Sequence, residues 1–343
     1  HTGFKGAWLA LWLNKLGAKV YGISKSETEH GTLYNYLKRL NFKEEYFLDI
    51  VDVDSTVKVF SAIKPDFIFH LAAQPIVSVA YQNPFETIAT NTLGTASILQ
   101  YPIICEHPVV VVMITSDKCY ENIESIWGYK ETDKLGGVDP YSASKAMAEL
   151  AISSYFRSFI MNRNNIKLGI ARAGNVIGGG DFAISRLVPD CIKSWQQKKP
   201  VEIKNPTATR PWQHVLEPLS GYLLLGQRLQ KDGCLNGEAF NFGPGKDSNK
   251  TVVDLISILS GGDPNKRYEI SQTSPFYEAQ LLQLNCEKAM AYLGWAPVLN
   301  FEEACAFTRD WFSGSNKGKE EFSLNQIFEY EQLATFRKII WAH

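Results

Sequence analysis

A run of six apolar residues, Val109 to Ile114, constrains the fold of this chain more than any other feature. Its β-branched residues predict a strand that is buried on both faces, as in a parallel sheet. A polar segment, Thr115 to Lys118, follows at once, and a helix is expected to open near Asp139. Because ligands of open α/β sheets bind beyond the carboxyl ends of the strands, we expect a site here.

Two residues of the predicted helix, Tyr141 and Lys145, are four positions apart and therefore share one helix face. An ammonium beside a phenol favours the phenolate, so we expect Lys145 to lower the pKa of Tyr141. A phenol of lowered pKa can take a proton from a hydroxyl near neutral pH. Together with Ser116, Asp117 and Lys118, this stretch offers a hydroxyl, a carboxyl, two amines and an activated phenol.

Strands and helices alternate through the first half of the chain. Strands are predicted at 18–23, 47–50, 66–71, 109–114 and 167–171, with helices at 54–64 and 85–100, and residues 26–46 are polar and irregular. This alternation predicts α/β architecture: βαβ units in a doubly wound parallel sheet of the Rossmann type. Beyond about residue 180 the alternation weakens. We therefore expect a first domain at 1–178 and a smaller, interleaved C-terminal substrate domain at 179–343, with 212–230 returning to the first.

The segment Thr2-Gly3-Phe4-Lys5-Gly6 runs into a helical pattern. A Gly-rich helix start presents backbone N–H groups and the positive end of the dipole, which suits a pyrophosphate, although the same pattern also fits a helix start without a ligand. The strand that leads into such a turn is expected to precede His1. Asp49 is interpreted either as an adenine contact or as a solvated loop acid, and His70 as a core histidine.

Composition narrows the class of protein. A net charge of −1 gives no general attraction for nucleic acid or an anionic membrane, so local groups must hold any anionic ligand. The six cysteines show no CxxC spacing, which indicates reduced thiols and a cytoplasmic protein. No apolar run reaches the ~18 residues of a membrane span, and we predict no metal site.

Several longer segments carry a family resemblance. They are HTGFKG at 1–6, HLAAQP at 70–75, TSDKCYEN at 115–122, DPYSASK at 139–145, ARAGNVIGGGDF at 171–182 and RPWQHVLEPLSGYLLL at 210–225. On these motifs the chain resembles the extended short-chain dehydrogenases/reductases, and more narrowly the CDP-glucose 4,6-dehydratases of bacterial deoxysugar and lipopolysaccharide pathways. Two segments depart from the pattern: residues 26–46, and 275–279, where a histidine-containing segment is expected.

The resemblance implies NAD as cofactor and CDP-D-glucose as substrate, converted to CDP-4-dehydro-6-deoxy-D-glucose. It implies that Tyr141 takes the 4-hydroxyl proton, with Lys145 and Ser116 in support, that Lys118 removes the C5 proton and that Asp117 protonates the departing C6 hydroxyl. The segment from Ser24 to Ser26 contains no acidic residue, so the sequence leaves the choice between NAD and NADP open. The expected cofactor contacts are Thr2, Gly3, Phe4, Lys5, Gly6, Asp49, Ile50, Leu71, Ala72, Ala73, Thr115, Tyr141 and Lys145.

Arginine forks match phosphate oxygens, so Arg210 is the first candidate for the substrate diphosphate, with Arg172 and Arg186 next. The other expected substrate contacts are Gln74, Asn175, Leu187, Val188 and Asn241. The helices at 85–100 and 141–156 are expected to pair between subunits in a homodimer or homotetramer, by analogy with the fold. A sugar nucleotide 4-epimerase and a non-catalytic, NAD(P)-sensing binding protein stay open as alternatives.

Overall fold

The computed structural model describes residues 1–26, 32–37, 42–245, 249–271, 281–314 and 318–342. The segment 275–279, where a departure from the family pattern was noted, lies outside them. The larger sheet is parallel and has the order β10-β5-β4-β3, formed by Ala239–Phe242, Ile166–Ala173, Val109–Ile114 and Phe67–His70. All six residues of β4 are buried. The predicted doubly wound parallel sheet is confirmed.

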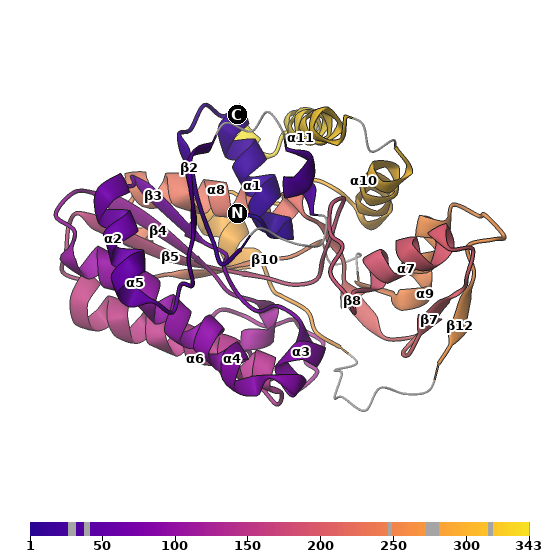
Figure 1. The fold of residues 1–343 in the computed structure, drawn as a ribbon, viewed down its shortest axis with the longest axis horizontal. Coiled ribbons are helices and arrows are strands. Elements are labelled where there is room, and N and C mark those ends of the chain that lie inside the picture. Colours follow the sequence, from indigo (N-terminus) through magenta and orange to yellow (C-terminus); the bar gives the residue numbers. More distant parts are fainter. Residues whose placement is uncertain (27–31, 38–41, 246–248, 272–280, 315–317, 343) are drawn as a thin grey trace.

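Helices cover both faces of this sheet (Figure 1). One face carries α2 (Val53–Ile63), α5 (Gly94–Ile104) and α6 (Pro140–Tyr155), and the other carries α1 (Phe4–Lys15) and α8 (Leu216–Lys231). Alternate residues of β4 pack against the two helical layers: Val111 belongs to one hydrophobic cluster and Val112 to the other. This explains why the strand is apolar throughout.

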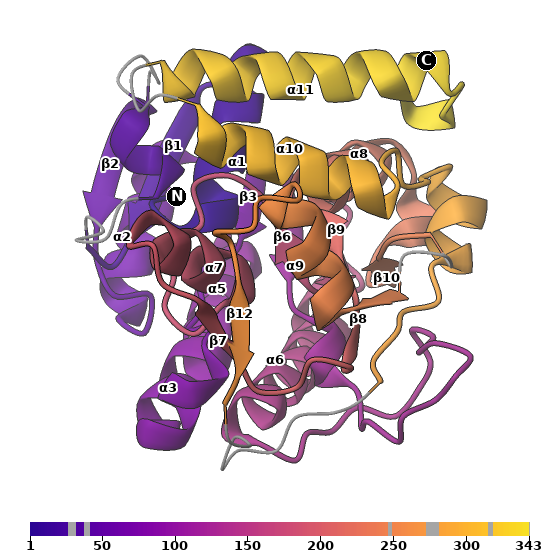
Figure 2. The same cartoon turned by 90° about the vertical axis from the view of Figure 1, so that its right-hand side faces the viewer.

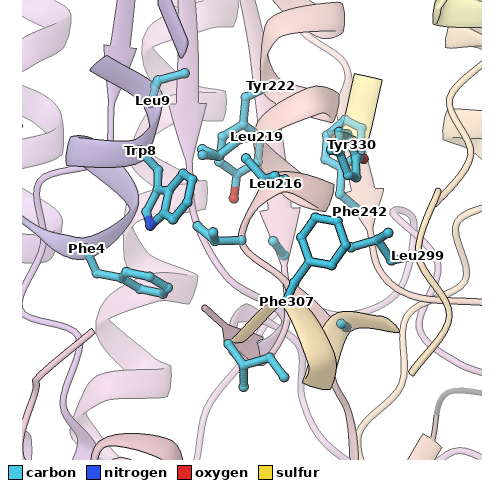
Figure 3. Close-up of a cluster of buried hydrophobic side chains, with 14 of the residues drawn as sticks. Phe4, Trp8, Leu9, Leu216, Leu219, Tyr222, Phe242, Leu299, Phe307 and Tyr330 are labelled. Atoms are coloured by element: carbon cyan, nitrogen blue, oxygen red, sulfur yellow. The ribbon is translucent and has the colours of Figure 1, made fainter. Parts of the chain in front are cut away.

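The core between α1 and α8 fixes the start of α1 against the sheet (Figure 3). Trp8 is fully buried, and its indole N–H donates to the Gly179 carbonyl over 2.8 Å. Burial of each such large apolar side chain contributes about 1.5–3 kcal/mol. Other buried members are Phe4, Leu9, Leu216, Leu219, Tyr222, Phe242, Phe307 and Tyr330.

A second, two-stranded parallel sheet pairs β1 (Val20–Ser24) with β2 (Phe42–Phe47). Within the described residues it shares no strand with the larger sheet. The prediction that residues 26–46 are irregular is wrong, because β2 and the short helix η1 (Leu33–Tyr36) lie there. The predicted strand at 47–50 is also displaced: β2 ends at Phe47, and its exposed charged residues concealed the strand pattern.

The predicted helix at 85–100 is interrupted. It consists of α4 (Pro84–Ile88), the π-helical turn η2 (Ala89–Leu93) and α5, which continues to Ile104. The helix α3 (Val77–Gln82) precedes it, and the π-helical turn η4 (Phe156–Ile160) extends α6.

The smaller lobe lies beside the carboxyl ends of the strands (Figures 1 and 2). It contains β7 (Val201–Ile203) with β12 (Tyr268–Ile270), β8 (Thr209–Pro211) with β11 (Asn249–Thr251), and the helices α7 (Leu187–Gln196) and α9 (Val252–Ser260). Two longer helices, α10 (Phe301–Ser313) and α11 (Lys319–Phe336), lie near the C-terminus. The short elements are β6 (Val176–Ile177), β9 (Gln213–His214), η5 (Gly233–Leu235), η7 (Ala289–Leu293) and η8 (Ile340–Ala342).

The helix α8 packs on β4 and β5, so the chain crosses back to the sheet after β9. None of the described helices combines the length and the apolar character that crossing a membrane requires.

Candidate active site

The end of β4 turns sharply at Ser116. A single 3₁₀ turn, η3 (Asp117–Cys119), begins there, and Ser116 is its N-cap. The Ser116 hydroxyl donates to Asp117 Oδ1 over 2.8 Å and accepts from the Lys118 N–H over 3.3 Å. Because the chain has left strand geometry, Asp117 and Lys118 are not forced onto opposite faces of the sheet.

The first turn of α6 brings a second set of groups to the same place. The Asp139 carboxylate caps this helix by accepting the N–H groups of Tyr141 (2.9 Å) and Ser142 (3.0 Å). The cap fixes where the helix starts, and therefore which way Tyr141 and Lys145 face. Both side chains are buried, and the η3 turn packs against α6.

The environment of Tyr141 differs from our expectation. Burial raises the pKa of the Tyr141 phenol to about 12, while a hydrogen bond with Ser116 opposes this shift. The predicted lowering of this pKa by Lys145 is wrong, because burial outweighs the favourable contacts of the phenolate. Burial also lowers the pKa of Lys145, to about 8.

Asp117 is buried, and burial raises the pKa of its carboxyl, against the opposing effects of the Lys118 charge and the Ser116 hydrogen bond. Its Oδ2 atom has no hydrogen-bond partner in the described part of the chain. A Cβ atom at Gly174 would lie 2.9 Å from Oδ2, so the glycine is needed beside the carboxyl. A buried oxygen without a partner is costly, which makes Oδ2 the atom left for a ligand.

Lys5 reaches the same centre from the first turn of α1. Its Nζ atom lies 3.4 Å from the Tyr222 hydroxyl. Burial and the charges of Arg186 and Lys145 lower the pKa of Lys5 to about 7, whereas Asp117 opposes this shift. Arg186, the N-cap residue of α7, donates to Asp181 over 2.9 Å.

The N-terminus of α1 is open to an anion. No side chain caps it, and Gly3 is exposed with open space where a Cβ would stand. Thr2 is turned away and bonds to the Ser24 hydroxyl over 3.2 Å. The backbone around Gly6 passes so close to His1 that a Cβ would contact it at 3.0 Å. This geometry fits the pyrophosphate of a dinucleotide.

The remaining predicted cofactor contacts lie around the ends of β2 and β3. Asp49 is paired with Lys25 over 3.1 Å, and Ile50 is buried among apolar residues. Leu71, Ala72 and Ala73 follow β3, and Ala72 is exposed. His70 bonds to Thr95 over 3.0 Å, which confirms its interpretation as a core histidine.

Three predicted contacts belong instead to a buried network. Arg172 donates to both carboxylate oxygens of Glu149, over 2.8 and 2.9 Å, and Thr115 bonds to the same carboxylate. The Tyr120 hydroxyl accepts from Arg172 and donates to Asn241 Oδ1. The predicted substrate contacts of Arg172 and Asn241, and the cofactor contact of Thr115, are therefore corrected: these polar atoms are held within the protein.

The other predicted substrate residues lie on several elements and differ in burial. Gln74 is held by Asn91, whose Oδ1 accepts the Gln74 N–H over 2.8 Å. Asn175 precedes β6, and Arg210 lies half-buried on β8. In the first turn of α7, Val188 is buried and Leu187 packs beside it in the core.

Sequence reasoning missed four residues that shape this site: Glu149, Gly174, Asp181 and Tyr222. Glu149 is four residues beyond Lys145 on α6, so helical spacing was an available signal. Gly174 and Asp181 lie inside the ARAGNVIGGGDF segment, but nothing in the pattern indicates which neighbour each contacts. Tyr222 had no signal of its own within an apolar helix.

Known proteins resemble this chain both in sequence and in fold. The GDP-mannose 4,6 dehydratase family model matches residues 1–308. The chain is 40% identical to the CDP-glucose 4,6-dehydratase of Salmonella typhimurium strain LT2, over 98% of this chain and 95% of that protein. It is 23% identical to the UDP-glucose 4-epimerase of Mycoplasma genitalium, over 74% of this chain and 77% of that protein.

Solved structures share the fold. DesIV, a dTDP-glucose 4,6-dehydratase from Streptomyces venezuelae solved with NAD and TYD bound, gives a TM-score of 0.78 at 23% identity, over 91% of this chain and 94% of that chain. A UDP-glucuronic acid 4-epimerase from Bacillus cereus in complex with UDP-glucuronic acid and NAD gives 0.76 at 21% identity, over 91% and 96%.

Proposed function

This chain belongs to the GDP-mannose 4,6-dehydratase family, and we propose that it is an NAD-dependent hydro-lyase that removes water from a nucleotide-activated hexose. The substrate we propose is CDP-D-glucose, and the product is CDP-4-dehydro-6-deoxy-D-glucose. The observation that carries the proposal is the turn at Ser116, Asp117 and Lys118 beside Tyr141. The similarity to the Salmonella enzyme supports the choice of nucleotide.

The residues at the start of α1 fit NAD. The open N-terminus at Gly3, with Phe4 and Gly6, suits its diphosphate, and Ala72 and Ala73 leave room beside β3. When bound there, NAD would supply the redox chemistry of the reaction, as the hydride acceptor for C4 and the hydride donor for C6 of the sugar. Asp49 and Ile50 are proposed to contact the adenosine part, and Lys145 the nicotinamide ribose.

The side chains have complementary roles in this proposal. Tyr141 takes the 4-hydroxyl proton while Ser116 orients the 4-oxygen. The resulting ketone acidifies the C5 proton, which Lys118 removes, and Asp117 gives a proton to the departing C6 hydroxyl. Burial of Asp117, which raises the pKa of its carboxyl, favours this acid role.

We propose that cationic groups hold the substrate diphosphate. Arg186, at the start of α7, lies near Lys5 and Tyr141, whose pKa values its charge lowers. Arg210, on β8, is the second arginine of this set, and Gln74 and Asn175 are proposed to contact sugar or phosphate oxygens. Leu187 and Val188, in the first turn of α7, are proposed to cover the nucleotide base.

An epimerase of the same fold is the nearest alternative. It needs Tyr141, Lys145 and Ser116, but not an acid and a base at Asp117 and Lys118. The two functions differ in mass, because dehydration removes one water and epimerisation none. Incubation with nucleotide-glucoses and NAD, followed by mass spectrometry, tests the proposal. An unchanged mass with every nucleotide would refute it.

A label tests the hydride scheme separately. Deuterium placed at C4 of CDP-glucose should appear at C6 of the product, whereas its loss to solvent would contradict hydride return. A binding protein without turnover would leave the label at C4.

We also propose a cytoplasmic homodimer or homotetramer that supplies a deoxysugar for lipopolysaccharide. Exposed apolar side chains on α4 and α6 support subunit pairing: Phe85 is 84% exposed and Leu150 58%. A Leu150→Glu variant that keeps the wild-type mass by light scattering would refute pairing through α6.

A further inference from the structure

The turn after β4 carries Ser116, Asp117 and Lys118, whereas Tyr141 and Lys145 lie on α6. The proposed reaction needs both sets of side chains at one sugar ring. Within the turn, the Ser116 hydroxyl bonds to Asp117 Oδ1 and to the Lys118 N–H. These two bonds shape the turn, but they do not fix it to α6. Other contacts must therefore hold the turn in place against the helix.

The first end of the turn is tied to α6 through Thr115. The Thr115 hydroxyl donates to Glu149 Oε1 over 2.5 Å. Glu149 lies on α6, one helical turn beyond Lys145, and both side chains are buried. The Thr115 N–H donates to the Ala171 carbonyl over 2.9 Å, which continues the pairing of β4 with β5. The residue before Ser116 is thus bonded to the helix that carries Lys145.

The other end of the turn is held through Tyr120, its C-cap residue. The Tyr120 hydroxyl accepts from Arg172 Nη1 over 2.7 Å and donates to Asn241 Oδ1 over 2.8 Å. The guanidinium also lies over the Tyr120 ring, with Cζ 4.9 Å from the ring centroid. Because Arg172 is the ion-pair partner of Glu149, the contacts of both ends meet at one buried pair.

We propose that Thr115 and Tyr120 are positioning residues for the reaction. They anchor the two ends of the turn to the Glu149–Arg172 pair, and this pair joins α6 to β5. The side chains of all four residues are buried, so water does not compete for their hydrogen bonds. This inference rests on the proposed function, because it explains how the proposed acid and base are aimed at the sugar.

Loss of either anchor should affect the two half-reactions unequally. Asp117 and Lys118, the proposed acid and base for water loss, both lie on the turn. Tyr141 and Lys145, proposed to act in oxidation at C4, stay in place on α6. A displaced turn should therefore slow water loss more than oxidation, and reduced cofactor should accumulate during turnover.

Two substitutions remove one anchor each and keep the ion pair intact. Thr115→Val removes a hydroxyl with little change of shape, and Tyr120→Phe removes the other. In each variant, kcat for CDP-glucose should fall by about 10- to 100-fold, because a displacement of ~1 Å at reacting groups can cost on the order of 100-fold in rate. KM should change little, because the groups proposed to hold the diphosphate lie outside the turn. Thr115→Ser keeps the hydroxyl and should restore kcat.

Matched controls remove buried hydroxyls elsewhere in the chain. Thr308 on α10 donates to the Ala304 carbonyl over 2.8 Å, and Tyr330 on α11 donates to Glu217 over 2.9 Å. Thr308→Val and Tyr330→Phe should lower Tm but leave kcat at the wild-type value below the unfolding transition. A merely structural role for Thr115 and Tyr120 would give this same result in their variants.

Steady-state kinetics with product mass, cofactor absorbance and thermal unfolding test the proposal. Low kcat with accumulated reduced cofactor in Thr115→Val and Tyr120→Phe, and restored kcat in Thr115→Ser, is the expected result. Wild-type kcat in the folded variants, or a loss of kcat without reduced cofactor, would overturn the positioning role. If the wild type itself leaves the mass of CDP-glucose unchanged, the dehydratase proposal fails instead.

Discussion

The buried pair of Arg172 and Glu149 offers a sharp test of the corrected site. The two side chains are 5% and 2% exposed, and the guanidinium contacts both carboxylate oxygens. We predict that Arg172→Met destabilises the native state by about 3–5 kcal/mol, because Glu149 is left as a buried charge without its partner. An unfolding entropy of about 2.1 cal/mol/K per residue converts this loss into a fall of roughly 4–7 °C in Tm for a chain of this length.

Thermal unfolding followed by circular dichroism measures this fall, and calorimetric titration with the nucleotide sugar measures binding. The matched control is Arg210→Met, on β8, which should change Tm little but weaken substrate binding. A double variant, Arg172→Met with Glu149→Leu, should recover part of the lost stability, because neither charge is then unpaired. An Arg172→Met protein with wild-type Tm and weaker substrate binding would show that Arg172 binds the ligand after all.

Three further predictions concern single side chains. Tyr141→Phe should reduce turnover at least ~100-fold while NAD still binds, as measured by product mass and cofactor titration; substantial activity would remove Tyr141 from its role. Lys118→Ala should oxidise C4 and then stall, so that reduced cofactor accumulates by absorbance; normal product formation would refute its role as base. Burial raises the pKa of Glu217 to about 7 from 4.5. The protonated group therefore contributes stability that is fully present below about pH 4.5 and is lost as pH rises through about 7. Glu217→Gln should flatten this dependence in denaturant titrations, and an unchanged slope would contradict it.

Some parts of the fold and site followed from the sequence for identifiable reasons. The strand β4 packs one face against each helical layer, so its apolar sequence fits few structures other than a strand buried on both faces. The pair Tyr141 and Lys145 depends only on helical spacing and on the cap at Asp139. The turn at Ser116 followed from the need to aim two neighbouring side chains at one substrate.

Other parts depend on contacts between distant segments, which no local pattern contains. Arg172 was expected to bind phosphate because an arginine fork matches phosphate oxygens, but it binds Glu149, 23 residues away, instead. Lys5 lies in a motif typical of cofactor binding, yet its Nζ points to Tyr222, 217 positions later. The strand β2 was hidden because exposed charged residues, and not a core, occupy half of its side-chain positions.

The pKa values of the site bear on how Tyr141 works. A phenol with a pKa of about 12 holds its proton at neutral pH, so it can accept the 4-hydroxyl proton only as it gives up its own. An ionised carboxyl is a weaker base than a phenolate and cannot draw this proton from Tyr141, so a positive charge nearby must favour its loss. The charge of Arg186 already opposes the effect of burial on the pKa of this phenol. Cations nearby add to this effect, since a buried charge is felt more strongly than an exposed one. Binding of the positively charged cofactor ring beside Tyr141 would favour the phenolate further.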